Sequence, residues 1–219
     1  MATPGDLIEV MADALGVPQR TVFQYDRSLA EHGLRSKKGR GPSAATVTAR
    51  DAANLLIAAM ATPVSGLSIK DAARACQSYM SLRAGLRSNE ESKPTPRWLI
   101  RSNLPREHSF GDALAVLIDN CGRDNVWKAS KPKVDRLSLK VSLEGPRPMA
   151  EIVYIASPDE FASQNSLNGR RLVYGGRKRA HRDHAALDET FGDLTLRGSI
   201  TLFTIQALGS LLKDEREAR

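Results

Sequence analysis

The stretch from Ile8 to Arg27 constrains the fold more than any other, because it predicts two short amphipathic helices joined at Gly16. Small or apolar side chains recur at helical spacing on both sides of this glycine. Glycine readily adopts the positive φ that a tight turn between helices requires. The predicted inner-face residues are Met11, Ala12 and Leu15 on the first helix, with Val17, Val22 and Tyr25 supplying the inner face of the second, which opens at Pro18. This arrangement is typical of a helix-turn-helix.

The second helix would leave a mixed polar and aromatic set pointing outward: Gln19, Arg20, Phe23, Gln24 and Arg27. Arginine and glutamine are the side chains that pair with guanine and adenine edges in the major groove of DNA. The stretch therefore predicts a helix that recognises duplex DNA. An ordinary pair of packed helices that binds nothing remains the alternative, and the small Ala12 at the helix crossing favours the first interpretation.

A basic segment follows directly and extends from Arg35 to Arg50 without an acidic residue. Its positive residues are Arg35, Lys37, Lys38, Arg40 and Arg50. Glycines and a proline predict a turn at its tip, as in the wing of a winged helix, which places positive charge on phosphates. A basic interdomain linker is the alternative. The next helix is predicted to start at once, with a Thr48-x-x-Asp51 capping pattern before the apolar run Ala52–Ala61, which favours the wing.

Two parts of this region resemble known regulators. The run Arg20-Thr-Val-Phe-Gln-Tyr25 resembles the recognition helix of MerR-type regulators, and Arg27-Ser-Leu-Ala-Glu-His-Gly-Leu34 resembles the end of a MarR-type or phage-type winged helix. The chain departs from the MerR type because its glycine follows the tyrosine later and because it lacks a long coiled-coil helix. The resemblance covers about the first quarter of the chain. It implies a winged helix-turn-helix that binds DNA. The sequence also resembles, in general character, regulators carried by bacterial prophages.

The positive net charge of the whole chain would favour binding to a polyanionic partner. The formal net charge is +7 and the isoelectric point about 9.6. A second basic cluster lies near the C-terminal third and suggests secondary phosphate contacts: Arg170, Arg171, Arg177, Lys178, Arg179 and Arg182. Charge alone does not distinguish DNA from RNA.

The rest of the chain predicts further helices and then strands. Helices are expected over Thr48–Ala61, from Ser68 to about Ala84, in a short piece from Pro96, and over Phe110–Cys121 behind Ser109. Alternating apolar and polar residues predict strands over Leu137–Leu143 and Met149–Ala156, joined by a turn at Glu144–Pro148, and a third over Arg171–Tyr174. A last helix over Leu202–Lys213 would begin at Ser199 or Thr201 and is a candidate dimerisation element, with an apolar side of Leu202, Ile205, Leu208, Leu211 and Leu212.

These elements predict a mainly α fold with a small α+β C-terminal part. The expected order is a winged helix-turn-helix over residues 1–62, a helical middle region over 63–128, and a C-terminal α+β part over 129–219 for oligomerisation or partner binding. Cys76 and Cys121 are expected to be small buried apolar groups in a reducing compartment. With neither a signal sequence nor an apolar run long enough to cross a membrane, the sequence predicts a cytoplasmic protein.

No catalytic or cofactor pattern emerges from the sequence, so we expect no enzyme, no cofactor and no metal. His181 and His184 could share a helix face, but the neighbouring Arg177, Lys178 and Arg182 would repel a cation. The stretch Gly169–Gly176 lacks the spacing of a phosphate-binding loop. Trp98 and Trp127 are interpreted as core anchors rather than stacking platforms.

The sequence thus predicts a sequence-specific, DNA-binding transcriptional regulator that works as a homodimer. Base contacts are expected from Gln19, Arg20 and Gln24, and phosphate contacts from Thr21, Arg27, Lys37, Lys38 and Arg40. Two alternatives stay open. One is a DNA packaging protein similar to phage terminase small subunits, and the other is an interaction module that contacts RNA polymerase with secondary DNA binding.

Overall fold

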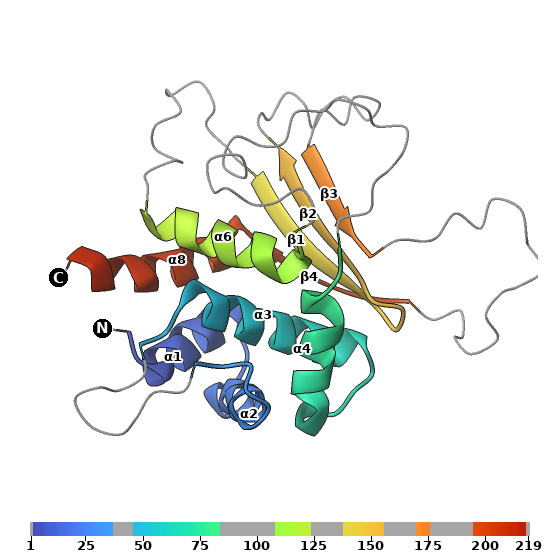
Figure 1. The fold of residues 1–219 in the computed structure, drawn as a ribbon, viewed down its shortest axis with the longest axis horizontal. Coiled ribbons are helices and arrows are strands. Elements are labelled where there is room, and N and C mark those ends of the chain that lie inside the picture. Colours follow the sequence, from blue (N-terminus) through green and yellow to red (C-terminus); the bar gives the residue numbers. More distant parts are fainter. Residues whose placement is uncertain are drawn as a thin grey trace, which may run out of the picture.

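A layer of helices packs against one face of a four-stranded antiparallel sheet, as Figure 1 shows. The computed structural model describes residues 2–36, 46–83, 108–123, 138–155, 170–175 and 195–217. The elements are α1 (Pro4–Leu15), α2 (Gln19–Glu31), α3 (Ala49–Val64), the 3₁₀ turn η1 (Ile69–Asp71), α4 (Ala72–Met80), α6 (Phe110–Arg123), β1 (Ser138–Gly145), β2 (Met149–Ile155), β3 (Arg170–Tyr174), β4 (Leu196–Thr201) and α8 (Leu202–Glu217). The prediction of a mainly helical fold with a small sheet is confirmed. No helix in these ranges is long and apolar enough to cross a bilayer.

The two N-terminal helices and the glycine between them are confirmed. Gly16 ends α1 with φ 64°, in the left-handed region. The Val17 amide donates to the Ala12 carbonyl over 3.1 Å, which is the 6→1 hydrogen bond of a Schellman motif. Pro18 precedes α2 as its cap residue rather than serving as its first helical residue. This short turn fixes the direction in which α2 leaves α1.

Helix α3 lies at the centre of the fold and contacts α2, α4, α6, β1 and β4. It begins with the predicted capping box, in which Thr48 and Asp51 satisfy each other's backbone amides. The predicted end before Thr62 is wrong, because the helix continues through Pro63 to Val64. Burial of Thr62 and Val64 and a 2.7 Å hydrogen bond from the Thr62 hydroxyl to the Ala58 carbonyl hold this last turn in place.

The helix predicted from Ser68 to about Ala84 is shorter than expected. It starts as the turn η1, where the Ser68 hydroxyl lies 2.6 Å from the Asp71 carboxylate, and α4 ends at Met80. After Met80 the chain turns, and the next backbone carbonyls accept hydrogen bonds from other segments. The Leu82 carbonyl accepts from the Phe110 amide (2.8 Å), and the Arg83 carbonyl accepts from the Gly175 amide (3.0 Å). These long-range hydrogen bonds replace those that a longer helix would have made.

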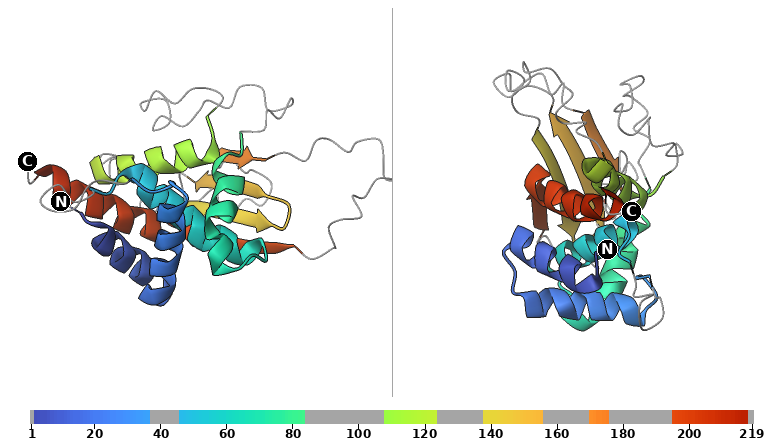
Figure 2. Two further views of the ribbon diagram at one scale, coloured as in Figure 1. Left: turned by 60° about the horizontal axis from the view of Figure 1, so that its bottom comes forward. Right: turned by 90° about the vertical axis from the view of Figure 1, so that its left-hand side faces the viewer.

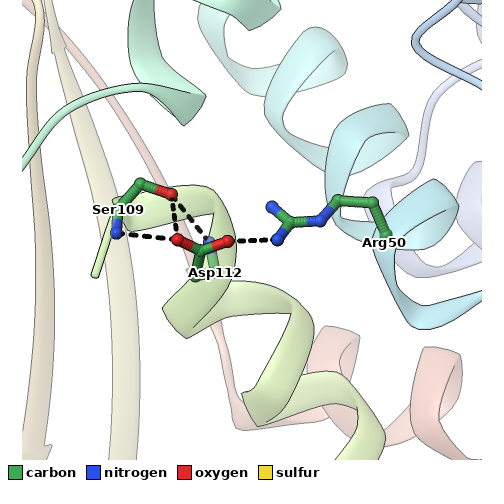
Figure 3. A network of polar contacts seen from close by, with 3 residues as sticks. All are labelled: Arg50, Ser109 and Asp112. Atoms are coloured by element: carbon green, nitrogen blue, oxygen red, sulfur yellow. Dashed lines mark hydrogen bonds and ion pairs between the residues drawn. The ribbon is translucent and has the colours of Figure 1, made fainter. Parts of the chain in front are cut away.

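Helix α6 confirms the predicted cap and buried stripe. Ser109 and Asp112 form a capping box, with the Ser109 hydroxyl 2.7 Å from the Asp112 carboxylate. Arg50 of α3 donates a hydrogen bond to the same carboxylate, so Asp112 ties the first turns of the two helices together (Figure 3). Partial burial favours the neutral acid, but the hydrogen bonds from Ser109 and Arg50 outweigh it and lower the pKa of Asp112 to about 2.

The sheet has the strand order β3-β2-β1-β4, with all neighbours antiparallel. Strands β1 and β2 form the predicted hairpin, and β3 is the predicted third strand. Strand β4 was not predicted, since a helix was expected to begin at Ser199 or Thr201. It is an edge strand in which Leu196, Gly198 and Ile200 alternate with polar residues, but only Ile200 is buried, so the alternating pattern is weak. Pairing with β1, for example Val141 opposite Ile200, makes it a strand.

The hairpin is locked against the helices at Gly145. A Cβ atom there would lie 2.1 Å from the Val64 carbonyl oxygen, so only glycine allows this approach. The Tyr79 hydroxyl donates to the neighbouring Glu144 carbonyl over 2.7 Å. The sheet therefore contacts the ends of both α3 and α4.

Helix α8 closes the fold by packing against α6 and α1. Ile205, Leu208 and Leu212 are buried in the common core, so the greater part of the side predicted for dimerisation faces inward. The core is one cluster to which all three predicted segments (1–62, 63–128 and 129–219) contribute. The predicted short helix from Pro96, Trp98 and Trp127, and the tip of the predicted wing lie outside the described residues; the wing is not confirmed.

Replacing Asp112 by asparagine should lower the free energy of unfolding near pH 7 by about 1 kcal/mol, because it weakens the cap and the ion pair with Arg50. The native state holds this carboxyl ionised at pH values where the unfolded chain, with a pKa of 3.8, takes up a proton. The stabilisation is thus complete above about pH 5 and is lost as the pH falls through 3.8 toward about 2.

Urea denaturation of both proteins across this range checks the expectation. The difference between the wild type and Asp112→Asn should shrink as the pH falls. The control is Asp13→Asn, an exposed aspartate of α1. A difference that stayed constant with pH would contradict the role assigned to Asp112.

Candidate nucleic-acid interface

The outward face of α2 carries the predicted base-contacting residues. Successive residues of an α-helix are rotated by about 100°, which places Gln19, Arg20, Phe23, Gln24 and Arg27 on one continuous side. All five are exposed. Figure 2 shows α2 along the outer margin of the helical layer, away from the sheet. The structure therefore leaves this side of the helix open to a partner.

The opposite side of α2 anchors it firmly. Val22, Tyr25 and Leu29 are buried in the core, as the sequence predicted for Val22 and Tyr25. The Ser28 hydroxyl also connects α2 to η1 and α4. It donates to the Lys70 carbonyl of η1 and accepts from the Ala73 amide of α4, both over 3.3 Å. Apolar packing and these two hydrogen bonds fix the rotation of α2 about its axis. They thereby fix which residues it presents outward.

Three hydrogen-bonding side chains on the outward face have no partner within the described part of the chain: Gln19, Arg20 and Gln24. Arg27 differs, since its guanidinium is 2.9 Å from Glu31 on the same helix. That pair is 71% and 58% exposed, so it contributes little to stability and can open for another ligand. The face thus offers two amides and one guanidinium that the fold does not use.

The start of α2 also differs from the starts of α1, α3 and α6. Those three helices begin with Thr–Asp or Ser–Asp capping boxes. Helix α2 begins at Gln19, the preceding Pro18 supplies no side-chain cap, and the first turn has no acidic residue. Arg20 lies there instead, next to the positive end of the helix dipole. Helices α4 and α8 also lack an acidic residue in the first turn, so this feature is not peculiar to α2.

A groove of about 630 Å³ lies between the first turns of α1 and the outward face of α2. Its walls come from α1, α2 and the segment after α2: Pro4, Gly5, Ile8, Gln19, Arg20, Phe23, Asp26, Arg27, Ala30 and Arg35. Three guanidiniums line it. Of the three exposed acids of α1, Asp6 and Asp13 lie on the side of that helix away from the groove, whereas Glu9 lies one turn after Gly5.

Arg35 attaches the start of the basic segment to this groove. Its guanidinium donates to the carboxylate of Asp26 over 3.0 Å, and that carboxylate is buried on the inner side of α2. Burial raises the pKa of Asp26, and Arg35 opposes this rise while Asp51 adds to it. Asp51 also accepts from the Ser36 amide over 2.7 Å, so α3 holds the chain at the same point.

Sequence reasoning missed this structural role of Arg35 and the contribution of α1 to the groove. A usable signal was present. Asp26 falls between Val22 and Leu29 on the inner face of α2 by helical spacing, and a buried carboxylate requires a cationic partner. Arg35 is the next basic residue after those on the outward face.

The remaining predicted contacts are only partly placed. Thr21 is half-buried at the margin of the face. Lys37, Lys38, Arg40, Arg177, Lys178, Arg179 and Arg182 lie outside the described residues. Arg170 and Arg171 belong to β3, which Figure 1 shows on the opposite side of the molecule from α2. The structure does not bring these two residues to the α2 surface.

The described residues contain no cluster of three or more acidic, histidine or cysteine side chains that could hold a metal. His181 and His184 lie outside this part of the chain. Cys76 is buried in α4, where burial raises the pKa of its thiol to about 12, which makes it unreactive. Cys121 in α6 is only half-buried. Comparison with known proteins found no matching family model, curated protein or solved structure.

Replacing Arg35 by methionine should destabilise the fold by about 1–3 kcal/mol near neutral pH, because it leaves the buried Asp26 carboxylate without its cation. Loss of Arg35 raises the pKa of Asp26 further. In the variant, folded Asp26 then takes up a proton at a higher pH than unfolded Asp26 does. The loss of stability relative to the wild type should therefore diminish as the pH is lowered.

Urea denaturation at neutral and acidic pH measures this deficit. The matched control is Arg27→Met, which breaks the exposed pair with Glu31 and should change stability by less than about 0.5 kcal/mol. Equal losses in the two variants would show that Asp26 does not depend on Arg35.

Proposed function

We propose that this protein is a sequence-specific, duplex-DNA-binding transcriptional regulator that inserts α2 into the major groove. The observation that carries the proposal is the outward face of α2, on which Gln19, Arg20 and Gln24 are exposed and have no partner in the described chain. The helix that carries them lies at the margin of the molecule. It is fixed from behind by Val22 and Leu29.

The dimensions and chemistry of this face suit the major groove. An α-helix with side chains is about 10–12 Å wide, close to the groove width of about 12 Å. Arg20 can donate two hydrogen bonds to guanine O6 and N7, and a glutamine can pair with adenine N6 and N7. Gln19 and Gln24 flank Arg20 on the same face, so the set would cover adjacent base pairs.

Phosphate contacts would come from the ends of this surface. Arg27 and Thr21 border the base-reading residues, and Lys37, Lys38 and Arg40 follow Arg35 in the sequence. The described residues hold nearly equal numbers of acidic and basic side chains. Most of the net charge of +7 therefore belongs to the other segments, of which the first follows Arg35 at the groove. Such contacts would position α2 without reading sequence.

Selection of bound duplexes from random-sequence DNA with the full chain tests the proposal. We expect an enriched motif, and a palindromic motif if the protein acts as a dimer with two equal half-sites. Failure of the chain to bind duplex DNA at low salt, or binding without any enriched motif, would overturn the proposal.

Replacing Arg20 by alanine should weaken binding to the selected duplex by about 1–3 kcal/mol and relax the preference at one base position. Fluorescence anisotropy gives the affinity, and repeated selection gives the preference. The control is Arg74→Ala, which removes an exposed arginine from α4 and should leave the motif intact. An Arg20→Ala protein with unchanged affinity and selectivity would exclude α2 as the reading helix.

Replacing Lys37 or Lys38 by alanine should weaken binding to all duplexes alike. A residue that contacts a phosphate releases counterions, so each replacement should reduce the slope of log affinity against log salt by about one unit. Titrations at several salt concentrations on the selected duplex and on an unrelated one measure this slope. Loss of motif preference with an unchanged slope would assign these lysines to base reading instead.

A further inference from the structure

Phe23 is the large apolar side chain that the outward face of α2 leaves in solvent, with 53% of its surface exposed. Water contact with an aromatic ring brings the fold no stability. Most surface positions of a helix hold residues such as glutamate, lysine or alanine, which form helices better than phenylalanine. A single exposed hydrophobic residue is common on a protein surface, so the side chains around Phe23 decide what it could contact.

The neighbours of Phe23 distinguish it from a protein-docking hydrophobe. It lies one turn after Gln19 and one turn before Arg27, with Arg20 three residues before it and Gln24 beside it. The other apolar side chains that line the groove are Pro4, Ile8 and Ala30, of which Ile8 is almost fully buried. One exposed ring surrounded by guanidinium and amide groups is a small apolar contact within a polar surface.

The major groove has a matching group. Thymine presents a 5-methyl group there, and apolar side chains recognise it by contact. Cytosine and uracil lack this methyl group, so the contact carries sequence information. The hydrogen-bonding residues around Phe23 would hold the adjacent bases while the ring covers the methyl group.

We propose that Phe23 reads a thymine by packing on its 5-methyl group, next to base pairs contacted by Gln19, Arg20 and Gln24. This inference rests on the proposed DNA-binding function and adds a base identity to it. The selected motif should contain a thymine whose methyl group contributes to affinity.

Replacement of each thymine of the selected duplex by deoxyuridine tests this directly, because only the methyl group is removed. At one position the wild-type protein should bind about fourfold more weakly, as expected for loss of one buried methyl group. The Phe23→Ala protein should bind the thymine duplex more weakly than the wild type does. It should bind the thymine and uracil duplexes equally.

Two controls keep the comparison specific. Phe203→Ala removes the exposed phenylalanine of α8, which is 68% exposed, and should retain the fourfold preference for thymine. Phe23→Leu retains an apolar group and should retain part of it. Thermal unfolding of the variants verifies that each is folded.

The outcomes separate this inference from the proposed function. If the wild type binds its motif but no thymine-to-uracil change affects affinity, the methyl contact is wrong and DNA reading by α2 stands. A Phe23→Ala protein that still distinguishes thymine from uracil also overturns the inference. If the wild type binds no duplex selectively, both proposals fail.

Discussion

Burial of α3 on almost every side is the constraint on which the rest of the fold depends. Small side chains on a helix let neighbouring elements approach its axis closely. Ala52, Ala53, Ala58 and Ala61 are such side chains, and all four are fully buried. Helices α2, α4 and α6 and strands β1 and β4 can therefore pack directly on α3. Larger side chains at these positions would force the layers apart.

The same helix determines where the candidate interface lies. Asp51 caps α3 and also accepts from the Ser36 amide, so one carboxylate serves the start of α3 and the chain that leaves α2. The Asn54 side chain donates to the Leu34 carbonyl over 2.7 Å and holds the same segment. The end of α2 and the first residues of the basic segment are thus attached to the most buried element of the protein. A rigid support of this kind keeps the exposed side chains of α2 in a fixed orientation.

Local signals predicted most of the helices, and long-range pairing explains what they missed. The capping pairs at Thr48 and Ser109 and the turn at Gly16 require only neighbouring residues, and these predictions are confirmed. Strand β4 exists because β1 pairs with it, and α4 ends early because Leu82 and Arg83 bond to distant segments. For the interface, helical spacing predicted which side of α2 is exposed. It could not predict that Arg35 binds Asp26, because that pair depends on how the chain turns after α2.

The arrangement of charges on α2 separates groups that hold the fold from groups that do not. Asp26 and Arg35 form an ion pair of 3.0 Å at the buried side. Arg27 and Glu31 form an exposed pair that adds little. Arg20 is unpaired within the described chain, and it lies at an uncapped helix start where a positive charge is unfavourable. Helices α1, α3 and α6 carry an acidic residue in the first turn, whereas α4 begins without one and has the exposed Arg74 there. An arginine at an uncapped helix start is therefore shared by two helices of this fold. What distinguishes α2 is that Gln19, Arg20 and Gln24 follow one another on its exposed side while its buried side is fixed to the core.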